Sequence, residues 1–336
     1  MATGLAVLLA ACSAGASPLS VGSQVASPTA AGSAGPSATR LHPPPCLEAT
    51  LAFDPATEAM LLANCVDQSD LDSLEQVWSW DGMAWTQLDA DGPPAMVVTG
   101  VAYDTDRRVV VRYGGLPMRS KTCQPETWEW DGSDWSDVSA DPPTACDHMF
   151  LAYEAARQRT LLFGGGDDDG NLIEETWAWD GTRWRLLTDS GPPGRAHFGF
   201  VYDDSHGQTL LYGGYDGSQV FNDFWTWDGS AWHQDALEEP GPRSHLGMAV
   251  RPDGMLLFGG ATNASTFTSL TDETWYLHRR WTRVEGPGPS ARGSPALGYD
   301  SVRNVFVLYG GFDSSGAALS DTWEWDGSWR CADGCS

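Results

Sequence analysis

The fold is decided by a short stretch that first reads Trp78-Ser79-Trp80-Asp81-Gly82 and is followed by Trp85. The stretch returns at intervals of roughly 50 residues, which is a period typical of propeller repeats. Its later copies start at Trp128, Trp177, Trp225, Trp275 and Trp323, the last two in altered form. A Gly-Gly pair precedes each later copy, and Asn64-Cys65 stands in its place before the first. The chain from Cys46 onward is therefore predicted to contain six equivalent units.

Each unit has the pattern of four short strands separated by turn residues. In the fourth unit these are predicted at His197–Tyr202, Thr209–Tyr212, Phe224–Trp227 and Ala231–Gln234. Asp228-Gly229 suits a tight hairpin between the last two strands, because both residue types tolerate a positive φ. Four-stranded sheets arranged radially leave only short, protected edges. The sequence therefore predicts an all-β, six-bladed β-propeller.

The tryptophans support this arrangement. The chain has 17 of them, and all fall in the three tryptophan positions of the six units, with Leu277 in the one position left. Two tryptophans that are two residues apart in a strand point to the same face, so each unit presents a pair to a neighbouring blade. Burial in the seams between blades explains this regularity without any ligand.

The units resemble kelch repeats. The resemblance rests on the Gly-Gly pair, on acidic-Thr-Trp sequences such as Glu175-Thr176-Trp177, and on an arginine before the next first strand, and it covers residues 46–336. The arginine position holds Arg195, Arg243 and Arg292 in the last three units, but Cys46, Met96 and Cys146 in the first three. We expect these arginines to form ion pairs with acidic residues of the set Glu175, Asp223, Glu273 and Asp321. The resemblance leaves function open, because kelch propellers include protein-binding domains, scaffolds and carbohydrate-acting enzymes.

The charge of the chain argues against nucleic acid as a partner. Among its 336 residues, 45 are acidic and 19 are Lys or Arg, which gives a net charge of −26 at neutral pH. The single lysine is Lys121, and the sequence has no basic cluster that could displace counterions from a phosphate backbone.

The amino terminus is similar to the signal of a bacterial lipoprotein. A short apolar run ends directly before Cys12, to which the lipid would be attached, although a basic segment before the run is missing. Residues 1–12 are therefore interpreted as a signal peptide, with an ordinary secretory peptide as the alternative. Residues 13–45 are rich in Ser, Ala, Gly and Pro and are predicted to be a disordered tether. We expect an exported, monomeric propeller that meets a membrane, on its periplasmic or outer side, only through this lipid.

The remaining six cysteines form an even set, and export favours three disulfides among them. The register of the units lets Cys46 meet Cys65 at one rim of the propeller and lets Cys123 meet Cys146 between neighbouring blades. Cys331 and Cys335 are then left for each other, although a bond from either of them to Cys46 would close the ring instead.

Three histidines occupy equivalent places in adjacent units. The residue five positions before the end of each first strand is Glu48, Val98, His148, His197, His245 and Ser294 in turn. If the three imidazoles pointed into the central channel, they would offer a site for a transition metal or an anionic ligand. If they pointed into the seams, they would be structural, and this is the orientation that we expect.

A second candidate site is the acidic loop Asp167-Asp168-Asp169, whose oxygens are of the kind that calcium binds. The loop lacks the alternating spacing of an EF-hand, so a solvated loop is the simpler interpretation. No cofactor is therefore expected, with calcium or a transition metal as the open alternatives.

No nucleophile elbow or phosphate-binding loop is present in the sequence. No copper ligand of galactose oxidase, a kelch-containing enzyme, can be transferred to this sequence. We therefore expect a binding or scaffold module that recognises a protein or a carbohydrate at Glu48, His148, His197 and His245 on the loop rim. The alternative is a sugar-active enzyme of the oxidase, epimerase or lyase type that uses the ionisable groups of the rim.

Overall fold

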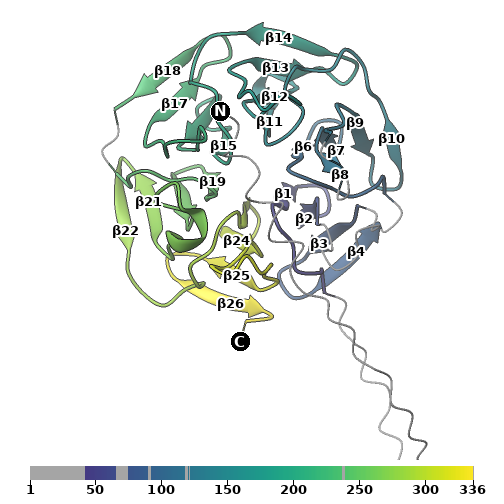
Figure 1. Ribbon diagram of the computed structural model, residues 1–336. Helices are drawn as coiled ribbons and strands as arrows, with labels where there is room; N and C mark the ends of the chain where they lie inside the picture. Colours follow the sequence, from purple (N-terminus) through teal and green to yellow (C-terminus); the bar gives the residue numbers. More distant parts are fainter. Residues whose placement is uncertain are drawn as a thin grey trace, which may run out of the picture.

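The computed structural model describes residues 42–65, 75–89, 92–117, 120, 122–236 and 239–335. Cys12, the predicted signal peptide and almost all of the predicted tether lie outside these residues. The described chain forms six antiparallel four-stranded sheets in a ring, as Figure 1 shows. The predicted six-bladed, all-β propeller is confirmed.

The first three blades are built from consecutive strands. Blade 1 contains β1 (Thr50–Asp54), β2 (Ala59–Ala63), β3 (Val77–Trp80) and β4 (Trp85–Asp89). Blade 2 contains β6 (Gly100–Asp104), β7 (Val109–Tyr113), β9 (Thr127–Trp130) and β10 (Trp135–Asp137), with the two-stranded β5 (Met96–Val97) and β8 (Leu116–Pro117) beside it. Blade 3 contains β11 (Phe150–Glu154), β12 (Arg159–Phe163), β13 (Thr176–Trp179) and β14 (Trp184–Thr188).

The last three blades repeat the order. Blade 4 contains β15 (Gly199–Asp203), β16 (Gln208–Tyr212), β17 (Phe224–Trp227) and β18 (Trp232–Asp235). Blade 5 contains β19 (Gly247–Arg251), β20 (Gly254–Phe258), β21 (Thr274–His278) and β22 (Arg280–Val284). Blade 6 contains β23 (Ala296–Asp300), β24 (Val305–Tyr309), β25 (Thr322–Trp325) and β26 (Trp329–Asp333). Short 3-10 turns occur at Ala155–Arg157 and Thr266–Thr268. The strands of blade 4 differ from their predicted bounds by at most two residues.

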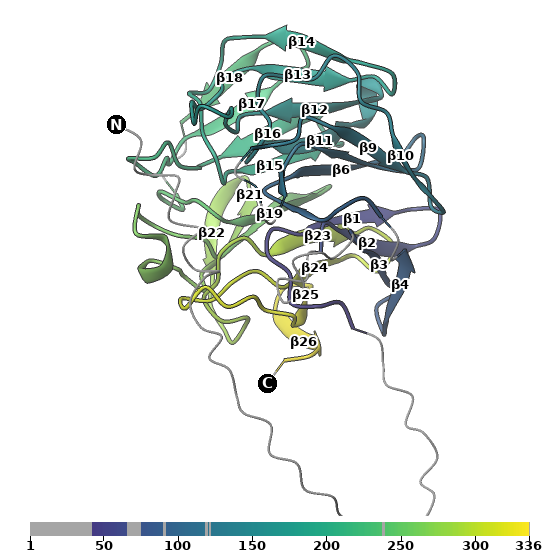
Figure 2. The same cartoon turned by 45° about the vertical axis from the view of Figure 1, so that its right-hand side comes forward.

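The first strand of each blade lies nearest the axis and the last lies at the perimeter. Figure 1 shows β1, β6, β11, β15 and β19 near the centre and β4, β10, β14, β18, β22 and β26 outside, and Figure 2 shows neighbouring sheets side by side. We call the face at which the first strands begin the rim face. The opposite face, where the first strand turns into the second, is called the hairpin face.

Many of the acidic residues stabilise turns. The Asp81 carboxylate accepts hydrogen bonds from the backbone N–H groups of Met83 and Ala84, and Asp180 and Asp228 do the same in later blades. On the hairpin face, Asp104 accepts from the N–H groups of its own turn. These aspartates are turn-forming residues of the kind that the backbone favours in hairpins. A large part of the negative charge therefore has a structural cause.

The Gly-Gly pairs of blades 2 to 6 join each of these blades to the next. The N–H of Gly214 donates to the carbonyl oxygen of Arg243 in the following blade at 2.7 Å, with φ of +106° at the glycine. A Cβ on Gly213 would lie 2.2 Å from the same oxygen. Gly311 repeats this bond to Cys46 at 3.1 Å, which joins blade 6 to blade 1. Only glycine fits here, because the backbone of the next blade approaches where a side chain would be.

Tryptophans form a second connection across the seams. Trp85, Trp184, Trp232 and Trp329 donate their indole N–H to a threonine hydroxyl of the preceding blade at 2.7–2.9 Å. The accepting residues are Thr322, Thr127, Thr176 and Thr274, the threonines of the acidic-Thr-Trp sequence. The threonine recurs in the repeat because its hydroxyl accepts a hydrogen bond from a tryptophan of the following blade.

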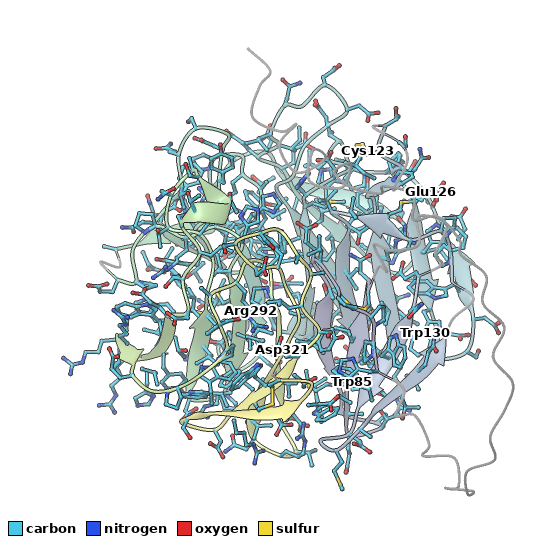
Figure 3. All side chains as sticks on the ribbon, turned by 60° about the horizontal axis from the view of Figure 1, so that its bottom comes forward. Trp85, Cys123, Glu126, Trp130, Arg292 and Asp321 are labelled. Atoms are coloured by element: carbon cyan, nitrogen blue, oxygen red, sulfur yellow. A yellow bond between two sulfur atoms is a disulfide. The ribbon has the colours of Figure 1, made fainter. Side chains whose placement is uncertain are left out.

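The arginines form the expected ion pairs within their blades. Arg195 binds Asp223 through two hydrogen bonds at 2.6 and 2.9 Å, and Arg292 binds Asp321 at 2.5 and 2.8 Å, as the labelled pair in Figure 3 shows. Arg243 pairs with Glu273. Glu175 instead accepts a hydrogen bond from Trp177. The arginine side chains are at most 2% exposed, so these pairs fix the geometry of the blades from the inside.

Candidate functional site

An axial channel is lined by the first strands of the six blades. Its wide part has a volume of about 470 Å³ and reaches the turns of the hairpin face, where Thr105, Ala155 and Asp204 line it. Its narrow part, toward the rim face, has a volume of about 70 Å³. The two parts share lining residues such as Thr50, Phe150 and Pro295, so the channel narrows toward the rim face.

The narrow part is surrounded by the six equivalent residues that the sequence singled out. They are Glu48, Val98, His148, His197, His245 and Ser294, and all line it. Each has a left-handed backbone, with φ between +46° and +56°. Hydrogen bonds run between neighbouring blades, from the N–H of His148 to Val98, of His245 to His197 and of Ser294 to His245, at 2.6–2.9 Å. This conformation is costly for residues other than glycine, so the ring is held by the blades around it.

The histidine side chains contact one another. The rings of His197 and His245 are stacked with centroids 3.7 Å apart, and His148 meets His197 edge to face at 4.8 Å. All three residues are at most 8% exposed. The expectation that the imidazoles point into the seams is not what the structure shows. They line the narrow part of the channel, at positions where the backbone is left-handed.

Glu48 joins the histidines. One carboxylate oxygen lies 3.6 Å from Nδ1 of His197, and the other accepts a hydrogen bond from the backbone N–H of Val98 at 3.2 Å. His148 Nδ1 lies 3.0 Å from the carboxylate of Asp147, the residue before it. The structure thus brings together all four residues that were predicted at the rim, but beneath the rim loops.

Burial shifts the pKa values of these four residues in different directions. It raises the pKa of Glu48 and lowers the pKa of His245 to about 3. Burial and the neighbouring imidazoles also hold the pKa of His197 well below its usual value. Burial alone would lower the pKa of His148, but its bond to Asp147 outweighs this and raises it. A proton is therefore held more readily by His148 than by His197 or His245.

Metal ligation was the open alternative for the histidines. Among the described residues, one group of three has its ligand atoms within 4.8 Å of one another, namely Cys123, Cys146 and Asp168. The two sulfurs of this group are joined in a disulfide. A tetrahedral site needs ligand atoms that surround one point, and the stacked imidazoles do not form such a group.

The acidic loop uses its carboxylates locally. Asp167 accepts hydrogen bonds from the backbone of Asp169 and Asn171 at 3.0 and 2.8 Å. Asp168 accepts from the backbone N–H of Cys123 at 2.9 Å, which links the rim loops of blades 2 and 3. Calcium at Asp167, Asp168 and Asp169 would have to compete with these bonds.

The cysteines pair as the register of the units indicated. Disulfides join Cys46 to Cys65, Cys123 to Cys146, and Cys331 to Cys335. The alternative of a ring-closing bond from Cys46 to the carboxyl terminus is not adopted. Figure 3 labels Cys123 on the second blade, and its disulfide ties this rim loop to the start of blade 3.

The loops of the rim face are closed at their base by the same backbone hydrogen bond, here called the neck, and differ beyond it. In five blades a backbone N–H at the end of the loop donates to the second glycine of the Gly-Gly pair at 2.8–3.0 Å. The closing residues are Gln124, Ile173, Phe221, Thr271 and Leu319. Beyond this bond the five loops differ in length and sequence, and the longest of the five belongs to blade 5. Several tips are tied down by an Asp or Asn, such as Asp216 and Asn263.

Sequence reasoning missed an aromatic collar at the other end of the channel. The residue before the last of each first strand is aromatic in five blades and lines the wide part. The collar consists of Phe53, Tyr103, Tyr153, Tyr202 and Tyr299. The signal was visible, because the aromatic residue recurs at one position of the unit. Its role needed the ring, in which equivalent residues surround one axis.

Comparison with known proteins supports the fold but gives no information on function. No protein-family model and no curated protein matches the chain. One solved structure that shares the fold is that of YjhT, with a TM-score of 0.67 at 14% sequence identity over 87% of this chain and 98% of that chain. At this identity the likeness shows the propeller fold alone. Among the described residues, no helix is long and apolar enough to cross a membrane.

Proposed function

We propose that the protein is an exported binding module, tethered to a membrane by a lipid on Cys12, that recognises a protein or a carbohydrate with its rim loops. The observation that carries this proposal is the constant neck beneath loops of different length and sequence. Loops that vary on a rigid scaffold are the usual site of recognition.

The rim loops are also ordered before any ligand arrives. Each neck is a backbone hydrogen bond, and the tips are closed by side chains such as Asp216 and Asp313. The Cys123–Cys146 disulfide and the bond from Cys123 to Asp168 connect two neighbouring loops. A surface that is ordered in advance loses less conformational entropy on binding. The rim face is thus better prepared for recognition than the short turns of the hairpin face.

The blade 5 loop offers the sharpest test, because Thr262 N–H donates to Ser269 at 3.1 Å across its base. Replacing residues 263–268 by Asn-Gly should keep this base and remove the tip. We expect wild-type protein to bind a component of a printed glycan array or of a solubilised cell-envelope protein set, and the shortened variant to bind it at least tenfold more weakly. His206→Ala on the hairpin face is the matched control. Equal binding by both variants, or binding to neither probe set, would contradict recognition by the rim.

Export and anchoring have their own test. The three disulfides support an oxidising compartment. Intact-mass spectrometry after expression with a lipoprotein export pathway should find lipid on Cys12, with Cys12→Ser released from the membrane. An unmodified protein that starts well beyond Cys12 would leave export in place and exclude the anchor.

A second candidate function is a sugar-active enzyme, favoured by the meeting of Glu48, His148 and His197. A carboxyl with a raised pKa beside one imidazole with a raised pKa and one with a lowered pKa is an arrangement suited to acid–base catalysis. NMR of a panel of reducing sugars and uronates, with wild type and Glu48→Gln, would detect epimerisation, anomer exchange, oxidation or elimination. Absence of any turnover beyond buffer by the wild type would exclude this candidate for the panel.

A further inference from the structure

The axial channel has the form of a binding site that is separate from the rim loops. Its volume of about 470 Å³ lies within the range of small-molecule pockets. The walls are made mostly of apolar side chains of the first strands, including Leu51, Val101 and Leu151, and the aromatic collar surrounds the entrance. A ligand that fills the wide part must therefore have an apolar body.

The narrow part carries polar atoms that lack partners. Glu48 Oε1, Thr99 Oγ1 and His245 Nε2 are buried without a hydrogen bond among the described residues, and all three residues line this part. His245 is only 4% exposed. Its Nδ1 lies 3.1 Å from the hydroxyl of Ser244, and in the tautomer in which Nδ1–H donates to that hydroxyl, Nε2 is an acceptor. An unpartnered buried polar group is costly, so such atoms point to a bound molecule or to water.

The ionised form of Glu48 is poorly compensated in the narrow part. Its Oε1 lies 3.6 Å from Nδ1 of His197, whose pKa burial holds well below its usual value. His148, which is paired with Asp147 at 3.0 Å, attracts Glu48 but does not offset the burial that raises the pKa of this carboxyl. A buried carboxylate of this kind is stabilised by a cation that enters the site.

We propose that the channel binds a primary amine with an apolar body, whose ammonium group donates to Glu48, Thr99 and His245 while its body lies along the first strands. A primary ammonium has three N–H donors, and the narrow part offers three unpartnered acceptors. Its volume of about 70 Å³ holds a head group of this size, since a water molecule takes about 30 Å³. Aromatic rings at the entrance suit a cation that passes them. The net charge of −26 attracts amines and repels carboxylates.

The test compares ligands that share one body and differ in the head group. Octylamine, octanol and octanoate are titrated into the folded protein by calorimetry at 0.15 M salt. We expect octylamine to bind with one-to-one stoichiometry, and octanol and octanoate to bind at least about tenfold more weakly, the usual size of a charge-assisted hydrogen bond. Equal binding of the three would show an apolar channel without recognition of the head group. Absence of octylamine binding would overturn the proposal.

Three variants locate the site. Glu48→Gln keeps the shape of the side chain and should weaken octylamine about tenfold or more without changing octanol. Ala52→Phe fills the wide part and should weaken both ligands, with the melting temperature used to verify folding. Asp134→Asn removes one negative charge from an outer hairpin and should change neither. If Glu48→Gln and Asp134→Asn have the same effect on octylamine, the amine binds through general attraction and the assignment to Glu48 is wrong. None of these outcomes depends on the rim loops, so failure of this proposal is distinct from failure of rim recognition.

Discussion

Two seams of the propeller, at Trp135 and Trp281, lack a hydrogen bond that the other four have, and restoring the one at Trp135 should stabilise the protein. The indole N–H of Trp135 in blade 2 is buried without a partner among the described residues. Its equivalents in four other blades donate to a threonine at 2.7–2.9 Å. The residue at the threonine position of blade 1 is Val77, which is 0% exposed and has no acceptor. The change is therefore Val77→Thr, which has nearly the same shape and supplies a hydroxyl.

The magnitude follows from the cost of a buried donor. Leaving an N–H unpaired costs about 1–3 kcal/mol, while a hydrogen bond contributes about 1 kcal/mol net. Part of this gain is lost because the new hydroxyl must itself be buried. We expect Val77→Thr to raise the free energy of unfolding by about 1 kcal/mol, from these values. In a domain of this size that corresponds to a rise on the order of 2 °C in melting temperature.

The assay is urea unfolding with thermal melting, on Val77→Thr and on the reverse change in the next seam. Thr127→Val removes the acceptor of Trp184, a residue 3% exposed, and should cost about 1–2 kcal/mol. A double-mutant cycle with Trp135→Phe isolates the pair, because the gain from the hydroxyl should vanish when the indole is gone. The reasoning is refuted if Val77→Thr is neutral or destabilising while Thr127→Val is harmful, or if the gain persists with Trp135→Phe.

Three further predictions concern pH, ion pairs and disulfides. The pKa of His245 is about 3 in the folded protein against 6.5 in the unfolded chain, so the free energy of unfolding should fall as the pH drops from 6.5 toward 3. His245→Gln should remove about 2 kcal/mol of the loss between pH 7 and pH 5, which urea unfolding at the two pH values will measure. Asp321→Asn leaves the charge of Arg292 buried without its partner and should cost about 3 kcal/mol in the same assay, whereas a change below about 1 kcal/mol would mean that the pair is not needed. Replacing both Cys46 and Cys65 by serine should cost about 3 kcal/mol for a loop of this length, with reduced wild type as the comparison, and an unchanged midpoint of unfolding would contradict this.

Much of the fold was predictable because the strands and turns of each unit are specified by residues within that unit. The tryptophan positions, the Asp-Gly hairpins and the Gly-Gly pairs all depend on spacings within one unit. Alternation of side chains in a strand then fixes which residues can face a neighbouring blade. The pairing of Cys46 with Cys65 followed in the same way, since both residues lie at the same end of two adjacent antiparallel strands.

The candidate site was predictable only in part. The sequence placed Glu48, His148, His197 and His245 at equivalent positions, and therefore at one height around the axis. It could not give their direction, because the left-handed backbone at these positions departs from the alternation of the strands. The stacking of His197 on His245 and the burial that lowers the pKa of both depend on how neighbouring blades pack around the axis.

The sequence by itself thus determined the number of blades, the residues that fill their seams and the ends of the strands, because these follow from a period and from local turn chemistry. Only the tertiary structure decided which indoles lack a partner, as Trp135 does opposite Val77, and that a channel with an aromatic entrance ends at Glu48. The physical reason is the same in both cases. A repeat specifies what each blade presents, whereas the contacts across a seam or around the axis arise between residues that different units contribute, and no spacing within a unit contains them.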